Sequence, residues 1–368
     1  MKLNAHMSKA VENTTLDKIL PLYQCSLTNS TVLPLGNGLI NSTFLVRSAN
    51  ISFVLQKINQ HVFTKPIDVV QNADLINKHL LLKQAQGQYQ LTPMRQLENT
   101  NKSTFSVVDN EYWRAIEFIP NCYTVEAVET SVQAQQVATA FAKFSYALND
   151  FPAQKLAVII PNFHHLGHRL TQLKQAVNKN SSDRFEDCHE LVNFCLAQQA
   201  FIEQVETLEK NLPLRVTHND TKINNLLFSS TNNNPIAVID LDTCMPGFIM
   251  HDFGDMVRTC CSSLPEDGKN IEQMYLREDI LSALAKGYLG ELAHQISDLE
   301  KQSLVIGAQL LPFMIGIRFL TDYIDGDNYF HTEYERHNLD RAKNQIQLFK
   351  LLNKIEPSIE KMIFQLPQ

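Results

Sequence analysis

The first third of the chain carries short apolar runs broken by Gly or Asn, a pattern typical of β-strands. It predicts strands over 32–35, 44–48, 52–56, 106–108 and 113–119. A helix is predicted over 66–82, because apolar residues recur there at the spacing of one helix face. The N-terminal part of the chain is therefore expected to be rich in β-structure.

The rest of the chain is mainly helical in its pattern. Apolar residues at helical spacing predict helices over 133–148, 166–177, 187–208, 255–262, 277–288, 298–311 and 340–353. A mixed segment over 215–242 interrupts them and contains two apolar strands. We therefore expect an α+β fold with a small β-rich N-terminal lobe over 1–119 and a larger, mainly helical C-terminal lobe over 120–368. Pro120 is the predicted hinge.

Composition narrows the classes of function. Among the 368 residues, Lys plus Arg number 32 and Asp plus Glu 39, which gives a net charge of −7. This balance argues against nucleic-acid binding and against docking on anionic membranes. The most apolar stretch, 303–320, contains Gln309, Pro312 and Arg318, which favours a buried core helix over a membrane span.

The cysteines and the N-terminus bear on location. The seven cysteines include no CxxC pair, which favours reduced thiols over a disulfide framework or a zinc site. The first residues contain no apolar stretch of the kind that secretory signals carry. Both observations predict a cytoplasmic protein.

The most informative segment is 216–228, in which His218, Asp220 and Asn225 stand in the order H-x-D-x-x-x-x-N. After a polar turn, an apolar run follows and ends in Asp240. Protein kinases use this order of a base Asp, a metal-binding Asn and a metal-binding Asp. A hydroxyl nucleophile needs a carboxylate to take its proton, and magnesium prefers carboxylate and amide oxygens. The spacing therefore predicts Asp220 as the base, with Asn225 and Asp240 on magnesium.

Other residues near this motif have predicted roles. Lys222 is placed to offset charge on a transferring phosphoryl group. His218 is expected to pin the loop, and Asp242 to be a second metal ligand or to orient the first. The sequence Asp252-Phe-Gly spells the kinase DFG motif but stands too far along the chain. Asp252 is therefore predicted to be a structural residue at a helix start that braces the catalytic loop.

The nucleotide-binding residues are expected in the N-terminal lobe. The segment 35–44, with Gly36 and Gly38, joins two strands, and its backbone N–H groups could cover phosphates; an ordinary Gly-rich hairpin is the alternative. Lys57 is the candidate for pairing with the phosphates. Because neighbours on a strand face opposite ways, Gln56 and not Lys57 could hold the inward position.

Three more positions complete this half of the prediction. Glu117 and Ile119 would face adenine through backbone groups just before the hinge. Gln71 stands where a kinase-like fold has the glutamate partner of the phosphate-binding lysine. A glutamine cannot form that ion pair, so the chain departs from the kinase pattern at this point.

Polar residues beside the apolar helix near residue 318 are candidates for binding the acceptor. Arg318, Asp322 and Tyr329 combine polar side chains with an aromatic face, as carbohydrate sites do. The alternative is that Arg318 and Asp322, four residues apart on a helix, only pair with each other. Asn41 belongs to the same candidate set. His164 could contact substrate or form a structural pair.

The chain resembles the aminoglycoside phosphotransferase/choline kinase-like superfamily, and within it the N-acetylhexosamine 1-kinase branch. The superfamily motif covers residues 218–242. The closer resemblance runs over 36–44, 54–63, 112–118, 160–164, 219–225, 239–247 and 318–323. It implies a bilobal protein-kinase-like fold, ATP and Mg²⁺ as cofactors, Asp220 as base, and Asn225 and Asp240 on the metal.

The resemblance also implies an acceptor, the anomeric hydroxyl of GlcNAc or GalNAc. The chain departs from this branch at two positions. Leu39 stands where the hexosamine kinases have a His before Ile-Asn, and Gln71 stands where the branch often has Glu. Kinases of the same fold that act on another sugar, choline, homoserine or an aminoglycoside remain alternatives, as does a nucleotide-binding pseudokinase. The expected partner is thus a small-molecule sugar, and the sequence makes no prediction of oligomeric state.

Overall fold

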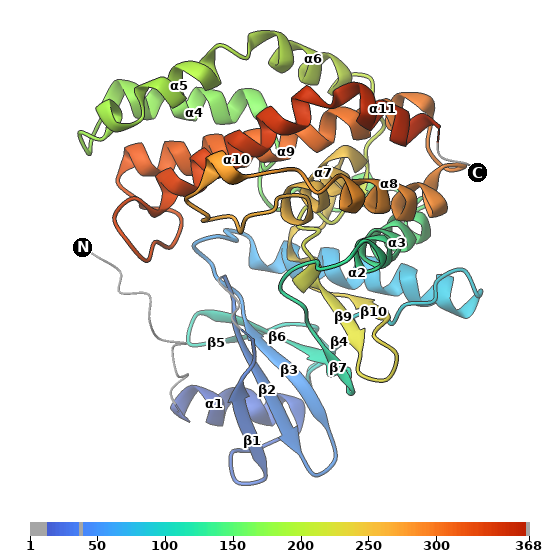
Figure 1. The fold of residues 1–368 in the computed structure, drawn as a ribbon. Coiled ribbons are helices and arrows are strands. Elements are labelled where there is room, and N and C mark those ends of the chain that lie inside the picture. Colours follow the sequence, from blue (N-terminus) through green and yellow to red (C-terminus); the bar gives the residue numbers. More distant parts are fainter. Residues whose placement is uncertain (1–12, 37–39, 366–368) are drawn as a thin grey trace. The chain divides into compact units, whose positions relative to one another are not determined.

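The computed structural model describes residues 13–36 and 40–365, which fall into two compact units (Figure 1). The first unit contains the chain up to Tyr123 together with 154–160 and 227–245, and the second unit contains the remainder. The sequence predicted one boundary after residue 119, without the two later segments. The segment 227–245 belongs to the first unit because β9 (Leu226–Ser229) pairs with β7 (Cys122–Tyr123).

The first unit is built on an antiparallel sheet. Its strands run in the order β1 (Ser30–Pro34), β2 (Ser42–Ser48), β3 (Ser52–Lys57), β6 (Glu111–Glu117) and β4 (Gln96–Leu97), and β5 (Ser106–Val108) also pairs with β6. All five strands predicted in this part of the chain are present. The sequence did not predict β4, because a strand of two residues carries no alternating pattern.

The pairing of β3 with β6 assigns their side chains to the two faces of the sheet. Lys57 lies opposite Trp113, and Gln56 lies opposite Arg114. Trp113 belongs to the apolar cluster in which α1 (Asn13–Ile19) buries its side chains. Because side chains alternate along a strand, Lys57 shares the face of this cluster, and Gln56 and Arg114 lie on the other face.

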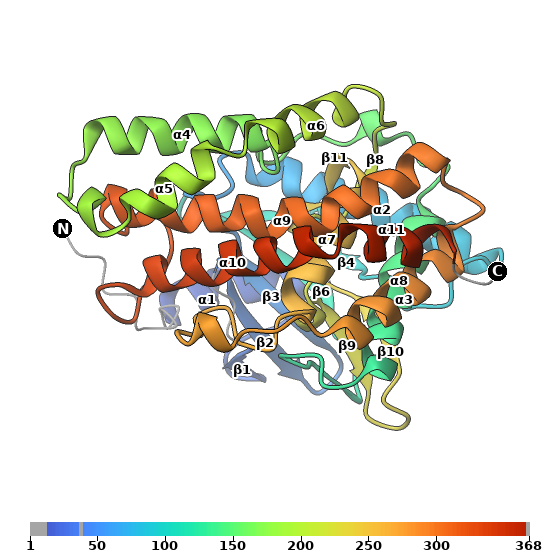
Figure 2. The same cartoon turned by 45° about the horizontal axis from the view of Figure 1, so that its top comes forward.

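The second unit is helical. Its helices are α3 (Ser131–Ala147), α4 (Leu166–Lys179), α5 (His189–Leu196), α6 (Gln199–Glu209), α7 (Ile249–Cys260), α8 (Glu278–Leu292), α9 (Asp298–Asp325), α10 (His337–Lys354) and α11 (Glu356–Phe364). Figure 2 shows α9 running between α4–α6 on one side and α10 on the other, and α9 also packs against α7 and α11. The central element of this unit is therefore α9.

Three of the predicted helices differ from the structure by a break or by six residues or more, and α1 and α11 were not predicted. The helix expected over 187–208 is divided into α5 and α6, although no Gly or Pro stands at the break. The helix expected from residue 255 begins at Ile249 instead. The helix expected to end at Leu311 continues through Pro312 to Asp325, because its side chains are buried on several sides and packing outweighs the lost backbone hydrogen bond.

By length and composition, α9 is the one helix among the described residues that could cross a membrane. Its most apolar window is 89% buried inside the protein, so that apolar character is used in the core. The start of α9 is fixed by a capping box between Ser297 and Glu300, and its end by Gly326 in the left-handed conformation. The structure thus agrees with the prediction of a buried core helix.

Two glycines bring α7 and α9 into close contact. A Cβ atom on Gly254 would lie 2.1 Å from the backbone oxygen of Gly307, and one on Gly307 would lie 2.2 Å from the backbone oxygen of Met250. Neither backbone can move aside as a flexible side chain would. The absence of a side chain at both positions therefore sets the distance between the two helices.

We expect Gly254→Ala to lower the free energy of unfolding by about 1–3 kcal/mol, because the added methyl group forces the packed helices apart. Gly290→Ala on α8 is the matched control, since a Cβ atom there meets nothing within 4 Å. In this control, the better helix propensity of alanine should stabilise the protein by about 0.5–1 kcal/mol. Urea unfolding measures both. Equal midpoints for Gly254→Ala and the unmodified protein would contradict the role of this contact.

Candidate active site

The predicted catalytic loop follows β8 (Arg215–Thr217) and is held by one carboxylate. Asp252, in the first turn of α7, accepts hydrogen bonds from the backbone N–H groups of His218 at 2.9 Å and Asn219 at 2.7 Å. The Thr221 hydroxyl donates to the backbone oxygen of Asp252 at 2.6 Å. The prediction that Asp252 braces the catalytic loop is therefore confirmed.

The loop is tight and buried at this point. Asn219 has φ +64°, a left-handed conformation that asparagine tolerates better than most residues. Burial raises the pKa of Asp252 to about 6, although His218 and the two backbone N–H groups lower it. His218 is fully buried and packs edge-on against Phe141 and Phe144 of α3. Its position fits the structural role predicted for it.

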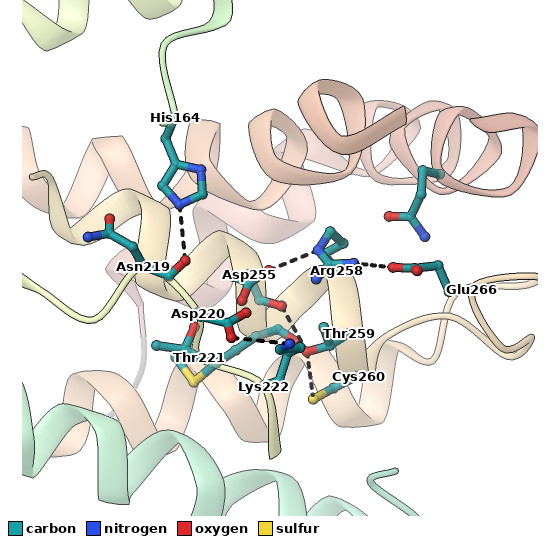
Figure 3. A network of polar contacts seen from close by, with 12 residues as sticks. His164, Asn219, Asp220, Thr221, Lys222, Asp255, Arg258, Thr259, Cys260 and Glu266 are labelled. Carbon is teal, nitrogen blue, oxygen red and sulfur yellow. Dashed lines mark hydrogen bonds and ion pairs between the residues drawn. The ribbon is translucent and has the colours of Figure 1, made fainter. Parts of the chain in front are cut away.

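Two predicted catalytic residues, Asp220 and Lys222, and the predicted metal ligand Asn225 come together on this loop. Asn225 donates from Nδ2 to the backbone oxygen of Asp220 at 2.7 Å and to its Oδ2 at 2.9 Å. The Lys222 Nζ lies 3.1 Å from the same Oδ2 (Figure 3). The Asp220 carboxylate remains partly exposed. The loop therefore presents an ionisable oxygen that an acceptor hydroxyl can reach, with a cation beside it.

A buried ion pair that the sequence analysis missed supports this group. Arg258 of α7 donates from Nε to Asp255 at 2.8 Å and from Nη1 to Glu266 at 2.6 Å. Burial lowers the pKa of Lys222, but Asp220 and Asp255 outweigh burial and raise it, so Lys222 stays charged near neutral pH. The signal for this pair was the spacing of Asp252, Asp255 and Arg258, which places all three on one helix face.

In the first unit, Asp242 is the most enclosed of the predicted metal ligands. It is 2% exposed; its Oδ1 accepts from Arg114 Nη2, and its Oδ2 accepts from Asn41 Nδ2 at 2.6 Å. Arg114, also 2% exposed, donates to Gln56 Oε1 at 2.9 and 2.7 Å. Because both Asp242 oxygens are taken by protein donors, its position favours the orienting role over direct metal binding. The Asn41 side chain is likewise occupied by protein partners, because its Nδ2 donates to Asp242 and its Oδ1 accepts from the backbone N–H of Asn59.

Arg114 was missed by the sequence analysis, and Lys57 was preferred in its place. Lys57 pairs with Glu111 at 3.3 Å and lies on the sheet face of the apolar cluster around Trp113. The face that carries Asp242 instead presents Gln56 and Arg114. This placement argues against the phosphate-pairing role predicted for Lys57. The signal for Arg114 was a charged residue inside an otherwise apolar strand.

The remaining residues predicted to bind the nucleotide are Gly36, Gly38, Glu117 and Ile119. Gly36 has φ +71°, which only glycine adopts without strain, and Gly38 and Leu39 lie outside the described residues. The Glu117 backbone N–H donates to Arg95, and the Ile119 carbonyl accepts from Cys122. Gln71 on α2 (Pro66–Ala85) is exposed.

The donor set that the structure offers to magnesium is small. The described residues contain no group of three or more His, Cys, Asp or Glu that could hold a metal ion. Asp240 has an exposed carboxylate and φ +59°, a conformation rare outside glycine and asparagine. Both hydrogen bonds of the Asn225 side chain use Nδ2, which leaves Oδ1 for a cation. Magnesium in nucleotide sites takes one or two protein ligands plus phosphates, so the chemistry of Asn225 in the second unit and of Asp240 in the first unit each suits it.

Among the predicted acceptor-binding residues, Asp322 and His164 are hydrogen-bonded to loops of the protein, whereas Arg318 packs against aromatic rings. The Asp322 carboxylate accepts from the backbone N–H groups of residues 328, 329 and 330 and from the Asn338 side chain, so it orders the loop after α9 and does not pair with Arg318. Arg318 instead lies against the rings of Phe163, Tyr329 and Phe330. His164 Nε2 donates to the Asn219 backbone oxygen at 3.1 Å, which ties it to the catalytic loop.

Known proteins share both sequence and fold with this chain. The model of the phosphotransferase enzyme family matches residues 31–286. A microcompartment-associated aminopropanol kinase superposes with a TM-score of 0.61 at 16% identity, over 94% of this chain and 98% of its own. An aminoglycoside phosphotransferase from Alicyclobacillus acidocaldarius gives 0.58 at 12% identity, over 94% and 95%. A choline kinase from Cryptosporidium parvum gives 0.54 at 16% identity, over 94% and 96%. These likenesses confirm the predicted α+β, kinase-like fold.

We expect Arg114→Met to lower the free energy of unfolding by about 3–5 kcal/mol, because it leaves the Asp242 carboxylate buried without its cation. The control is Lys18→Met, which removes an ion pair to Asp109 whose side chains are exposed, and which should change stability by less than about 1 kcal/mol. Urea unfolding with both variants checks this. A loss for Arg114→Met no larger than that for the control would show that the buried Asp242 carboxylate does not depend on Arg114 for its charge.

Proposed function

The chain belongs to the phosphotransferase enzyme family, and we propose that it transfers the γ-phosphoryl group of ATP to the anomeric 1-hydroxyl of an N-acetylhexosamine, GlcNAc or GalNAc. The observation that carries the transfer is the catalytic loop, where Asn225 and Lys222 both contact the Asp220 carboxylate. The choice of sugar rests on the sequence resemblance, with support from the polar and aromatic groups around Arg318.

In the proposed reaction, the acceptor hydroxyl gives its proton to an oxygen of Asp220, which Asn225 and Lys222 hold in place. Lys222 remains cationic and offsets charge that develops on the transferring group. Asn225 and Asp240 are each proposed as magnesium ligands, as the sequence predicted, and the ion when bound would supply positive charge to the phosphate oxygens. Positioning by the braced loop contributes the rest, since phosphoryl transfer needs little covalent chemistry from the protein.

The surroundings of Arg318 argue against a cationic acceptor. Choline or an aminoglycoside would need an acidic site with aromatic walls. The rings that could form such walls already pack against the Arg318 guanidinium, and the Asp322 carboxylate is consumed by the loop after α9. A neutral or acidic acceptor therefore fits these residues better than a cation does.

We expect Asp220→Asn to reduce turnover by about 10²–10⁴-fold, because the amide cannot accept the hydroxyl proton. The fold should be unchanged, since Asn can still accept from Asn225. Asp298→Asn is the control, because its side chain is 89% exposed in the same unit, and it should keep full turnover. Coupled ADP release measures turnover, and circular dichroism checks folding. Near-normal turnover in Asp220→Asn would remove Asp220 from the base role.

An acceptor screen tests the choice of substrate. We expect ADP release with GlcNAc or GalNAc to exceed that with glucose, galactose, choline and kanamycin, and ³¹P NMR to show a sugar 1-phosphate. Running each acceptor with ATP and with GTP tests the nucleotide. Faster turnover of choline or kanamycin would contradict the proposed acceptor but leave phosphoryl transfer standing. Nucleotide binding without transfer to any acceptor would favour a pseudokinase.

A further inference from the structure

Two arginines of the second unit lie close together without an acidic partner. Arg169 donates from Nη2 to the Phe163 backbone oxygen at 2.8 Å, and the Arg318 guanidinium lies over the ring of the same Phe163 at 5.5 Å. Among the described residues, neither forms an ion pair within 4.0 Å. Burial lowers the pKa of Arg318 and the Asp220 carboxylate raises it, so the predicted base attracts Arg318 without forming an ion pair with it. Buried or half-buried charges are normally paired, so the two guanidinium groups of this positive cluster lack a carboxylate in direct contact.

The packing around Arg318 leaves a defined part of its guanidinium for a ligand. The rings of Phe163, Tyr329 and Phe330 lie 5.3–5.6 Å from its Cζ, and its hydrogen bond to the Tyr329 hydroxyl is long, at 3.4 Å. Aromatic rings cover the faces of a guanidinium but do not use its N–H donors. Arg318 is half-buried, and Tyr329 beside it is 62% exposed. A planar fork of donors is the geometry that binds a carboxylate.

Two buried polar atoms beside these arginines also lack partners. Within the described part of the chain, Arg169 Nε and His164 Nδ1 have no hydrogen-bond partner. Burial and the positive groups around it, His251 foremost, hold the pKa of His164 well below its usual range, so the ring is neutral. Since Nε2 donates to the Asn219 carbonyl, Nδ1 is an acceptor and suits a hydroxyl group. Arg169 Nη1 and Nη2 donate to Gln172 Oε1 at 2.9 Å and to the Phe163 backbone oxygen at 2.8 Å, so Nε is the guanidinium nitrogen left for an oxyanion.

The positive charge of Arg169 and Arg318 lies beside the catalytic loop. Burial, and after it the neighbouring charge of Arg318, lower the pKa of Arg169 to about 10, so the two guanidinium groups lie near enough to repel each other. His164 contacts Asn219, the residue before Asp220. The positive cluster therefore adjoins the predicted base, in a chain whose net charge is −7.

We infer that Arg169 and Arg318 form a subsite for a carboxylate on the acceptor sugar, which N-acetylhexosamines oxidised at C6 to uronic acids would probe. This inference rests on the proposed sugar 1-kinase function. The carboxylate would supply the counter-charge that the two guanidinium groups lack, and the His164 Nδ1 would accept from a ring hydroxyl. Phosphorylation would still occur at the anomeric hydroxyl.

The test compares sugars that differ only at C6: GlcNAc with N-acetylglucosaminuronate, and GalNAc with N-acetylgalactosaminuronate. We expect kcat/KM for the uronate to exceed that for its neutral partner by at least about tenfold, as expected for charge-assisted hydrogen bonds. Calorimetric titration with the same sugars should give the same order of affinities. Binding and turnover together separate recognition of the carboxylate from the chemical step.

Arginine variants localise the preference. Arg318→Gln and Arg169→Gln keep a polar side chain but remove the charge, and each should reduce the uronate-to-neutral ratio toward one. Arg336→Gln is the matched control, because Arg336 is exposed and pairs with Asp187, and it should keep the ratio of the unmodified protein. Circular dichroism checks folding, and if one variant is unfolded the other carries the comparison.

The outcomes distinguish this inference from the proposed function. Turnover of GlcNAc or GalNAc with no uronate preference would overturn the subsite and leave the sugar 1-kinase standing. Absence of turnover with every sugar would reject the proposed function. In that case calorimetry decides on the subsite: tighter binding of uronates than of neutral sugars, lost in both variants, would still support it. Equal binding of uronates and neutral sugars would overturn it. A uronate preference that persists in both variants would also overturn it.

Discussion

The catalytic loop depends on one buried carboxylate. Asp252 accepts two successive backbone N–H groups of the loop, and this fixes the direction in which Asp220 leaves β8. Since Asp252 belongs to α7, the loop inherits its position from the packing of that helix. Gly254 and Gly307 have no side chains, and this allows α7 and α9 to pack at their short distance. The geometry of the proposed base is thus a consequence of helix packing and not of the loop sequence alone.

Each unit has its own buried ion pair beside a predicted functional residue. In the first unit Arg114 neutralises Asp242, and in the second Arg258 neutralises Asp255. Buried pairs add little net stability, but each becomes costly if one partner is lost, so they constrain where the remaining polar groups can lie. The effect is to leave Asp240, Asp220 and Lys222 as the more exposed charges of the motif. A nucleotide-dependent enzyme with a net negative charge needs such local arrangements.

The sequence predicted the catalytic loop better than the residues and helices around it. The loop motif, most strands and the bracing by Asp252 followed from spacing, because those signals are local in the sequence. Arg114 could not be chosen over Lys57, because the choice depends on how β3 pairs with β6. The break between α5 and α6 and the passage of α9 through Pro312 depend on tertiary packing, which overrides local propensity.

The acceptor is the property that neither the fold nor the motif determines. Solved structures named as kinases of aminopropanol and choline share this fold at 16% identity, so the same scaffold is compatible with chemically different acceptors. Selection must then arise from side chains outside the catalytic loop. We propose that in this chain they include Arg169 and Arg318, which form no ion pair among the described residues, while Asp322 accepts from backbone N–H groups instead of pairing with Arg318. Two guanidinium groups without an ion-pair partner would disfavour an ammonium group on the acceptor and favour an anionic one.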